Sequence, residues 1–332
     1  MKMTTLGDTG LATSRIGLGL AALGRPGYIN LGHSDDLRAG RDVASMEARA
    51  QVVLDAARSA GVRYFDAARS YGRAEDFLAG WLASRRIGPG EVTIGSKWGY
   101  TYTAGWQVEA DRHEVKDHSL GTLRRQVAET RAAFGPFVGL YQIHSATLES
   151  GVLDDPEVLE ALARLRSESG WKVGLSLTGP RQAETLRKAL GVEIGGERLF
   201  DCVQATWNLL EPSSGPALES ARAEGLGVIV KEALANGRLT GRNDDPGFLD
   251  RRRRLEAEAD RLGATLDALA LAAVLDRPWA DVVLSGASTV DQLASNLTAL
   301  EVPWDDRAEA NLQSLQEPPD AYWTARSRLS WN

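Results

Sequence analysis

Short runs of consecutive apolar residues alternate along this chain with longer stretches in which apolar residues recur every three or four positions. A short apolar run is typical of a strand buried on both faces, and the longer spacing is typical of a helix with one buried face. Eight such runs predict strands at residues 15–20, 63–65, 92–97, 138–144, 172–177, 201–206, 227–231 and 281–284.

A stretch with helical spacing follows each of these strands. Leu120, Leu123, Val127 and Phe134 lie on one face of a predicted helix, which ends at Gly135. The other predicted helices cover residues 45–61, 75–84, a stretch that begins at 155, and then 181–190, 214–223, 251–275 with a break at 263, and 289–300.

Eight strand–helix units within about 250 residues predict an α/β fold in which parallel strands close into a (β/α)8 barrel. An open, doubly wound sheet is the alternative, but no Gly-x-Gly-x-x-Gly sequence opens a helix after the first strand. Residues 1–332 are expected to form one barrel domain that begins with a small β-hairpin near residues 4–11. Residues 25–41 and 98–117 are expected to be long loops.

The composition is that of an ordinary globular protein. Apolar residues make up 43% and charged residues 25% of the 332 residues, which excludes a disordered chain, and the net charge of −7 argues against a nucleic-acid-binding surface. Cys202 is the only cysteine, so a reducing, cytoplasmic location without disulfides is expected. The first ten residues do not resemble a signal peptide, and no apolar run is long enough to cross a membrane.

Polar side chains stand at the ends of three predicted strands. Asp66 follows the strand at 63–65, Tyr71 lies five positions later, and Lys97 and His144 end two further strands. The carboxyl ends of parallel strands share one edge of a barrel, so these four side chains are expected to meet there. Taken singly, each has a plainer interpretation, as a helix cap, a loop packing residue, a surface ion pair or an interior histidine.

Together the four side chains predict a site that delivers a proton to a carbonyl group. A phenol is a weak acid near neutral pH, since its usual pKa is about 10. A lysine ammonium is expected to favour the phenolate and so to lower the pKa of Tyr71, while Asp66 keeps Lys97 charged. His144 is expected to hydrogen-bond the carbonyl and orient it.

The segments around these positions resemble motifs of the aldo-keto reductase superfamily, and the resemblance covers nearly the whole chain. The matching segments are residues 6–11, 14–19, 65–72 with Glu75 after them, 95–99 and 141–144. The resemblance implies a (β/α)8 barrel without a metal, in which a nicotinamide cofactor reduces aldehydes or ketones. It also implies that Tyr71 is the proton donor, that Lys97 and Asp66 tune it, and that His144 orients the substrate.

The resemblance further implies a nicotinamide site, and here the chain departs from the family pattern. Ser176 and Gln204 stand where the family binds the carboxamide, but Leu177 replaces the asparagine that usually follows this serine. Lys231 stands where a tyrosine usually stacks on the nicotinamide ring. Trp207 is a candidate replacement for that aromatic platform.

The cofactor's remaining contacts are expected in two segments near the end of the chain. Leu234 and Gly237 follow Lys231, whose plainer interpretation is an ion pair with Glu232. The last predicted helix begins at Thr289, and four residues around its start are expected to contact the adenosine phosphate: Gly286, Ser288, Gln292 and Asn296. NADP(H) is the first expectation, and NAD(H) remains open because the usual arginine or lysine is missing there. A helix cap without a ligand is the alternative.

A small carbonyl or sugar is the expected partner, with the chain a monomer or a small homo-oligomer. Its binding surface is expected to involve aromatic residues of the second long loop and of a carboxyl-terminal tail over the mouth of the barrel: Trp98, Tyr100, Tyr102, Trp106, Trp323 and Trp331. Two other functions remain open. The departures at Leu177 and Lys231 fit a nucleotide-sensing protein with little turnover, and Lys97 or Lys231 could serve a Schiff-base lyase.

Overall fold

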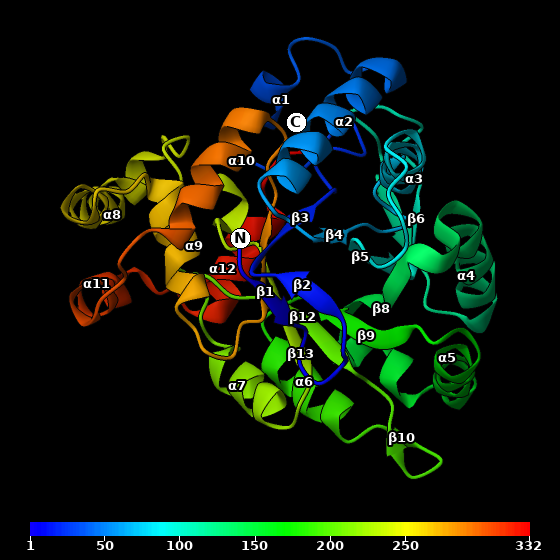
Figure 1. Cartoon of the computed structure of the whole chain (residues 1–332). Helices are drawn as coiled ribbons and strands as arrows, with labels where there is room; N and C mark the ends of the chain where they lie inside the picture. The colour runs from blue at the N-terminus through cyan, green and yellow to red at the C-terminus, as the bar shows by residue number, and fades with distance from the viewer.

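Eight parallel strands close into a barrel, which confirms the predicted architecture (Figure 1). The computed structural model describes residues 1–332. Around the ring the strands are β3 (Ile16–Gly19), β4 (Tyr64–Asp66), β5 (Thr93–Trp98), β8 (Val138–Ala146), β9 (Lys172–Leu177), β12 (Cys202–Thr206), β13 (Gly227–Lys231) and β14 (Val282–Ser285). β14 pairs with β3, with Val283 opposite Ile16, and this pairing closes the ring. Each strand therefore has hydrogen-bonded neighbours on both sides.

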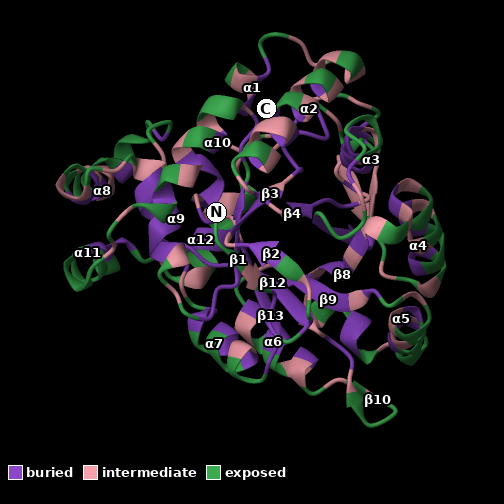
Figure 2. Cartoon of the chain, in the orientation of Figure 1, coloured by how far each residue is buried: buried purple, intermediate pink, exposed green.

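The chain has twelve α-helices, and most of them cover the outside of the barrel and expose their outer faces to solvent (Figure 2). They are α1 (His33–Asp36), α2 (Val43–Ser59), α3 (Ala74–Ser84), α4 (Leu120–Phe134), α5 (Pro156–Ser169), α6 (Gln182–Leu190), α7 (Gly215–Ala223), α8 (Leu249–Leu262), α9 (Leu266–Leu275), α10 (Val290–Leu297), α11 (Asp306–Leu312) and α12 (Pro319–Ser327). α9 is buried on all sides from Ala268 to Val274, because it packs between β14 and α8. None of the helices combines the length and the apolar character that a bilayer crossing needs.

Some elements differ from the expected ones for local reasons. α2 begins at Val43 rather than at Ser45, because the carboxylate of Asp42 caps the helix by accepting a hydrogen bond from Ser45 N. The two expected loops are partly regular: the first contains α1, and the second contains the antiparallel pair β6 (Tyr100–Tyr102) and β7 (Glu114–Lys116). A further small hairpin joins β10 (Glu193–Ile194) to β11 (Glu197–Arg198).

The expected amino-terminal hairpin is present as β1 (Met3–Thr5) and β2 (Ala12–Ser14). Its turn inserts the fully buried Leu6 into the apolar interior of the barrel, among residues that include Tyr64, Cys202 and Ile229. The fit is close, since a Cβ on Gly7 would lie 2.3 Å from Gly227 N. The hairpin therefore closes the amino-terminal end of the barrel, which leaves the opposite end for a ligand.

Leu6→Ala should destabilise the protein by about 2–5 kcal/mol, because the truncated side chain leaves a cavity in the barrel interior. Met3→Ala is the matched control, since Met3 lies in the same hairpin and is 44% exposed. Urea unfolding followed by tryptophan fluorescence gives both values. Equal midpoints for the two variants would show that the hairpin does not support the barrel.

Candidate active site

One cavity of about 660 Å³ opens at the carboxyl ends of the barrel strands, and we call it the mouth cavity. Asp66 of β4, His144 of β8, Gln204 of β12 and Lys231 of β13 line it, together with Tyr71 from the turn after β4. These residues are distant in the chain, but parallel strands bring their carboxyl ends to one edge. The structure thus brings the predicted catalytic residues to one place.

The turn between β4 and α3 fixes the position of Tyr71. Ala67 N donates to Gly95 O at 2.9 Å and Arg69 N donates to Lys97 O at 3.1 Å, which ties the turn to β5. Gly72 has a φ of +60°, and a Cβ there would lie 2.4 Å from Gly24 O. This conformation strongly favours glycine, so the Tyr-Gly pair sets the shape of the turn.

A fully buried lysine connects Tyr71 to Asp66. Lys97 Nζ forms an ion pair with Asp66 and donates to Ala67 O at 3.0 Å and to Tyr71 Oη at 3.3 Å. Asp66 also accepts hydrogen bonds from Gln204 Nε2 at 2.8 Å and from Tyr64 Oη at 3.3 Å. Because a buried charge is costly without partners, these bonds explain how an ion pair persists inside the barrel.

The expectation that Lys97 lowers the pKa of Tyr71 is wrong. Burial raises the pKa of the phenol well above its usual value of 10, and the negative charge of Asp66 adds to this effect. Asp66 neutralises the lysine at close range, so the pair presents little net positive charge to the phenol. Tyr71 is therefore a protonated phenol throughout the physiological pH range.

His144 is a neutral imidazole beside Tyr71. Burial, together with the positive charges of Lys97 and Arg25, lowers the pKa of His144 well below its usual value of 6.5. Its Nδ1 lies 3.4 Å from Ser70 Oγ, and its ring meets the ring of Tyr71 edge-on at 5.4 Å. Nε2 has no protein partner, so one ring nitrogen is free to face the cavity.

Arg25 is a further site residue, and it lies in the segment 25–41 for which the sequence predicts only a long loop. Its side chain is 4% exposed and lines the mouth cavity. Its guanidinium lies 5.3 Å from the ring centre of Tyr71 and 4.7 Å from that of Trp331, and it forms an ion pair with Glu114 at 2.9 Å. No local pattern identifies Arg25, because its partners come from three distant segments.

Ser176 and Gln204, the two residues expected to bind the nicotinamide carboxamide, do not both face the cavity. Gln204 lines the cavity, and since its Nε2 is bound to Asp66, its Oε1 remains without a protein donor. Ser176 does not line the cavity: its Oγ accepts a hydrogen bond from Ser145 N at 2.8 Å and so supports the rim. Leu177 is fully buried, and Thr178 follows it on the cavity wall.

The loop after β13 holds Lys231 in a network rather than leaving it free. Lys231 Nζ donates to Thr206 Oγ1 at 2.8 Å and lies 3.6 Å from Glu232, as the ion-pair interpretation predicted. Burial lowers the pKa of Lys231 to about 8. Burial alone would raise the pKa of Glu232, but the charges of Arg326 and Lys231 lower it to about 2.

The same loop has a strained backbone at the cavity wall. Glu232, Ala235 and Asn236 have φ values of +56°, +48° and +56°, which are uncommon for residues other than glycine and tend to occur at functional sites. Leu234 and Gly237 line the cavity as expected, and Asn236 also lines it with a buried Oδ1 that has no hydrogen-bond partner.

Trp207 is not the replacement for the missing aromatic platform. Its ring packs against Trp279 at 5.7 Å and under Arg277 at 5.1 Å, outside the mouth cavity. The second long loop also contributes fewer aromatic side chains to the cavity than expected. Trp98 is fully buried, and of the loop's four aromatic residues only Tyr100 lines the cavity. Of the two tail tryptophans, only Trp331 lines the cavity.

The start of α10 forms the far end of the mouth cavity. Gly286, Gln292 and Asn296 line it, while Ser288 does not. Thr289 caps α10 by accepting a hydrogen bond from Gln292 N, which confirms the predicted helix start. Asn296 Nδ2 donates to Ser285 Oγ at 2.8 Å.

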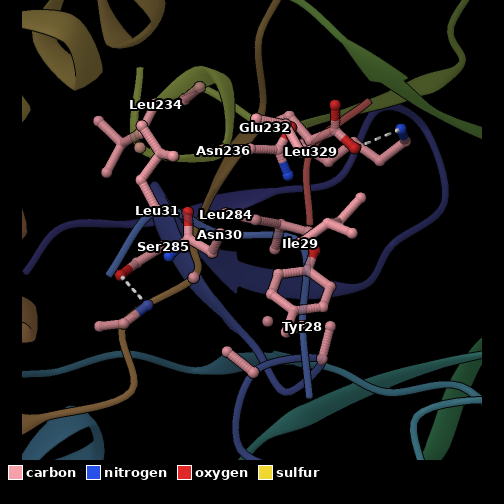
Figure 3. Close-up of a pocket in the computed structure, with 18 of the residues that line it drawn as sticks. Tyr28, Ile29, Asn30, Leu31, Glu232, Leu234, Asn236, Leu284, Ser285 and Leu329 are labelled. Atoms are coloured by element: carbon pink, nitrogen blue, oxygen red, sulfur yellow. Dashed lines mark hydrogen bonds and ion pairs between the residues drawn. The ribbon is translucent and has the colours of Figure 1, made fainter. Parts of the chain in front are cut away.

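Two segments from opposite ends of the chain cover the cavity. Residues 28–31 of the first long loop line it together with Leu234, Asn236 and Ser285 (Figure 3). Arg326, Leu329 and Trp331 of the carboxyl-terminal tail also line it, so the tail lies over the mouth as expected.

Comparisons with known proteins agree with the barrel fold. The Aldo/keto reductase family matches residues 15–317. The uncharacterized oxidoreductase YqkF of Bacillus subtilis is 25% identical, with 98% of this chain and 100% of the relative covered, and the NADH-specific methylglyoxal reductase of Escherichia coli is 24% identical, with 96% and 99% covered. An aldo-keto reductase of Bacillus halodurans, solved in its holo form, shares the fold with a TM-score of 0.72 and 22% identity over 96% of this chain and 97% of that one. Because the family match spans most of the sequence, this chain belongs to the aldo/keto reductase family.

Proposed function

We propose that this chain interconverts an aldehyde or ketone with its alcohol, using a nicotinamide dinucleotide and Tyr71 as the proton donor. The observation that carries the proposal is the bonded set of Asp66, Lys97 and Tyr71 beside a neutral His144 on one cavity. The family contains oxidoreductases, and the relatives named above fit a reaction of this class.

Tyr71 would exchange its proton with the substrate oxygen. When bound, the dinucleotide supplies or accepts the hydride. The oxygen that gains negative charge during reduction is a much stronger base than a phenolate, so a phenol of raised pKa can still protonate it. Lys97 Nζ, which donates to Tyr71 Oη, would stabilise the phenolate that remains. Tyr71 is half-buried at the cavity wall, so solvent can return the proton.

His144 would hold the substrate oxygen without exchanging a proton. If the Ser70 hydroxyl donates to Nδ1, the neutral ring carries its hydrogen on Nε2 and can donate it to a carbonyl oxygen. A neutral donor suits this role, because it polarises the carbonyl without competing with Tyr71 as an acid.

The mouth cavity has features that fit a dinucleotide. It extends from Tyr71 and His144 to the start of α10, and so offers one reactive end and one distant end. Gln204 Oε1 and the unpaired Asn236 Oδ1 can accept hydrogen bonds from amide groups. Arg25 and Lys231 line the cavity nearer its reactive end and can donate hydrogen bonds to phosphates.

The two alternative functions, a nucleotide-sensing protein and a Schiff-base lyase, both depend on Lys231. The replacement of the stacking aromatic by Lys231 favours a nucleotide-sensing protein with little turnover. A Schiff-base lyase cannot use Lys97, which is 0% exposed and fully engaged. Lys231 lines the cavity and its pKa of about 8 leaves a minor amine fraction at neutral pH, so it is the one candidate for that chemistry.

Titration with NADH and NADPH should quench tryptophan fluorescence, and Tyr71→Phe should retain this binding while its turnover falls by about 10²–10⁴-fold. The phenylalanine keeps the ring but cannot donate a proton. Quenching by neither dinucleotide would reject the proposed function. Tight binding without turnover of a broad carbonyl and alcohol panel by the unmodified chain would favour the sensor.

Between about pH 5.5 and 8 the rate of carbonyl reduction should show no break near pH 6.5, because burial lowers the pKa of His144 well below that value and the imidazole is already neutral there. kcat/KM measured over this range checks the expectation. His144→Asn is the control, since it keeps a donor that does not titrate and should have a lower rate with the same profile shape. A break that disappears in His144→Asn would show that the histidine changes charge during the reaction.

Borohydride reduction in the presence of a reducible aldehyde should add no mass to Lys231, because Thr206 and Glu232 hold its Nζ largely as an ammonium. Peptide mass spectrometry tests this, with Lys231→Met as the control for adducts on other lysines. A stable adduct at Lys231 that the control lacks would favour the lyase.

A further inference from the structure

A carboxylate of the chain itself accepts hydrogen bonds from two polar side chains at the start of α10. Asp36 is the last residue of the short helix α1, and its side chain is 5% exposed. Asp36 Oδ2 accepts hydrogen bonds from Gln292 Nε2 at 2.8 Å and from Ser288 Oγ at 2.9 Å. These are two of the residues that the sequence assigned to a cofactor phosphate.

Arg242 completes the shell around this carboxylate. Its Nη1 and Nη2 donate to Asp36 Oδ2 at 2.8 Å and Oδ1 at 2.5 Å, in a two-point ion pair. Burial alone would raise the pKa of Asp36, but the bonds from Arg242, Gln292 and Ser288 lower it. Asp36 is thus an anion at neutral pH, and the donors near it are already engaged.

Two further carboxylates add to the negative charge at the far end of the mouth cavity. The far end of the mouth cavity, from residue 240 onward, is also lined by the carboxylates of Asp267 and Asp291. Arg242 is the one cation among the lining residues from 240 to 296, and Asp36 neutralises it. A dianionic group there would therefore face Asp267 and Asp291 on the cavity wall and find no unpaired cation, while Asp36 lies just outside the lining, bonded to the wall residues Arg242 and Gln292.

The position of Asp36 is set by the whole segment 28–36, which spans the mouth. Leu31 N donates to Asn236 O at 3.0 Å on one side. On the other side Asn332, the last residue, bonds to Tyr28 through both backbone groups and accepts a hydrogen bond from Ser34 N at 2.9 Å through Oδ1. Asp36 is consequently held in place at several points along its segment.

We propose that Asp36 makes this site select a dinucleotide whose adenosine ribose has a free 2′-hydroxyl, NAD(H), over the 2′-phosphorylated NADP(H). The inference rests on the proposed function, which places the reactive nicotinamide near Tyr71 and hence the adenosine at the other end of the cavity. A ribose hydroxyl is uncharged and meets no repulsion at this end of the cavity, whereas a phosphate of charge about −1.5 to −2 is repelled by Asp36 and by the carboxylates on the wall. A phosphate would also compete with Asp36 for Ser288, Gln292 and Arg242.

The first test measures dissociation constants by tryptophan fluorescence, for NADH against NADPH and for ADP-ribose against its 2′-phosphorylated form. The unmodified chain should bind the forms without the 2′-phosphate at least about tenfold more tightly. The preference should narrow as ionic strength rises from about 0.05 to 0.5 M, because salt screens the like-charge repulsion. Equal or tighter binding of the phosphorylated forms would overturn the inference while leaving the proposed function in place.

The second test is Asp36→Asn, which keeps the size of the side chain and removes its charge. NADPH affinity should rise at least about tenfold, while NADH affinity should change less than about threefold. Asp35→Asn is the matched control, because this neighbouring carboxylate is exposed and bonds only to Arg38, so neither affinity should change. An equal shift of both affinities in Asp36→Asn would also overturn the inference.

The two tests separate failure of the inference from failure of the proposed function. Binding of neither dinucleotide nor ADP-ribose to the unmodified chain would reject the proposed function, and the selectivity of Asp36 with it. The ratio of the NADPH and NADH dissociation constants of the unmodified chain, and its salt dependence, are measured without any substitution. They therefore decide whether the site prefers NAD(H) even where Asp36→Asn does not fold.

Discussion

The buried ion pair between Lys97 and Asp66 is the interaction on which the rest of the site depends. Both side chains are almost completely withdrawn from water, so each charge needs the other and a full set of hydrogen-bond partners. The partners are the backbone of the turn after β4, Gln204 from the opposite side of the barrel, and Tyr71. The pair therefore joins three separate elements and sets where the phenol lies.

This arrangement changes what Lys97 does to Tyr71. In isolation an ammonium beside a phenol would lower its pKa, but a lysine neutralised by a carboxylate at contact distance cannot do so, and burial then raises the pKa of the phenol. The resting site therefore keeps its proton on Tyr71, and His144 stays neutral for the same reason of burial. A neutral phenol and a neutral imidazole therefore lie side by side on the cavity wall.

The cover of the mouth comes from parts of the chain that the barrel pattern leaves undefined. The first long loop and the carboxyl-terminal tail meet through Asn332, and Arg25 from that loop lies between Tyr71 and Trp331. The same loop carries Asp36 to the start of α10, so the elements that enclose the cavity also set the charge at its far end. The cover of the cavity and the carboxylate beside its far end thus come from one segment.

The sequence alone determined the barrel, because burial on both faces of a strand and on one face of a helix leaves a periodic pattern that is local. It also determined the meeting of Asp66, Lys97 and His144, since a residue at the end of a parallel strand has its position in the barrel defined by the fold. Only the tertiary structure decided that Ser176 turns to Ser145 rather than to the cavity, and that Trp207 packs outward. It likewise decided the contact of Asp36 with Ser288, which is 252 residues distant, because side-chain direction and loop path depend on packing and hydrogen bonds between remote segments that no local pattern records.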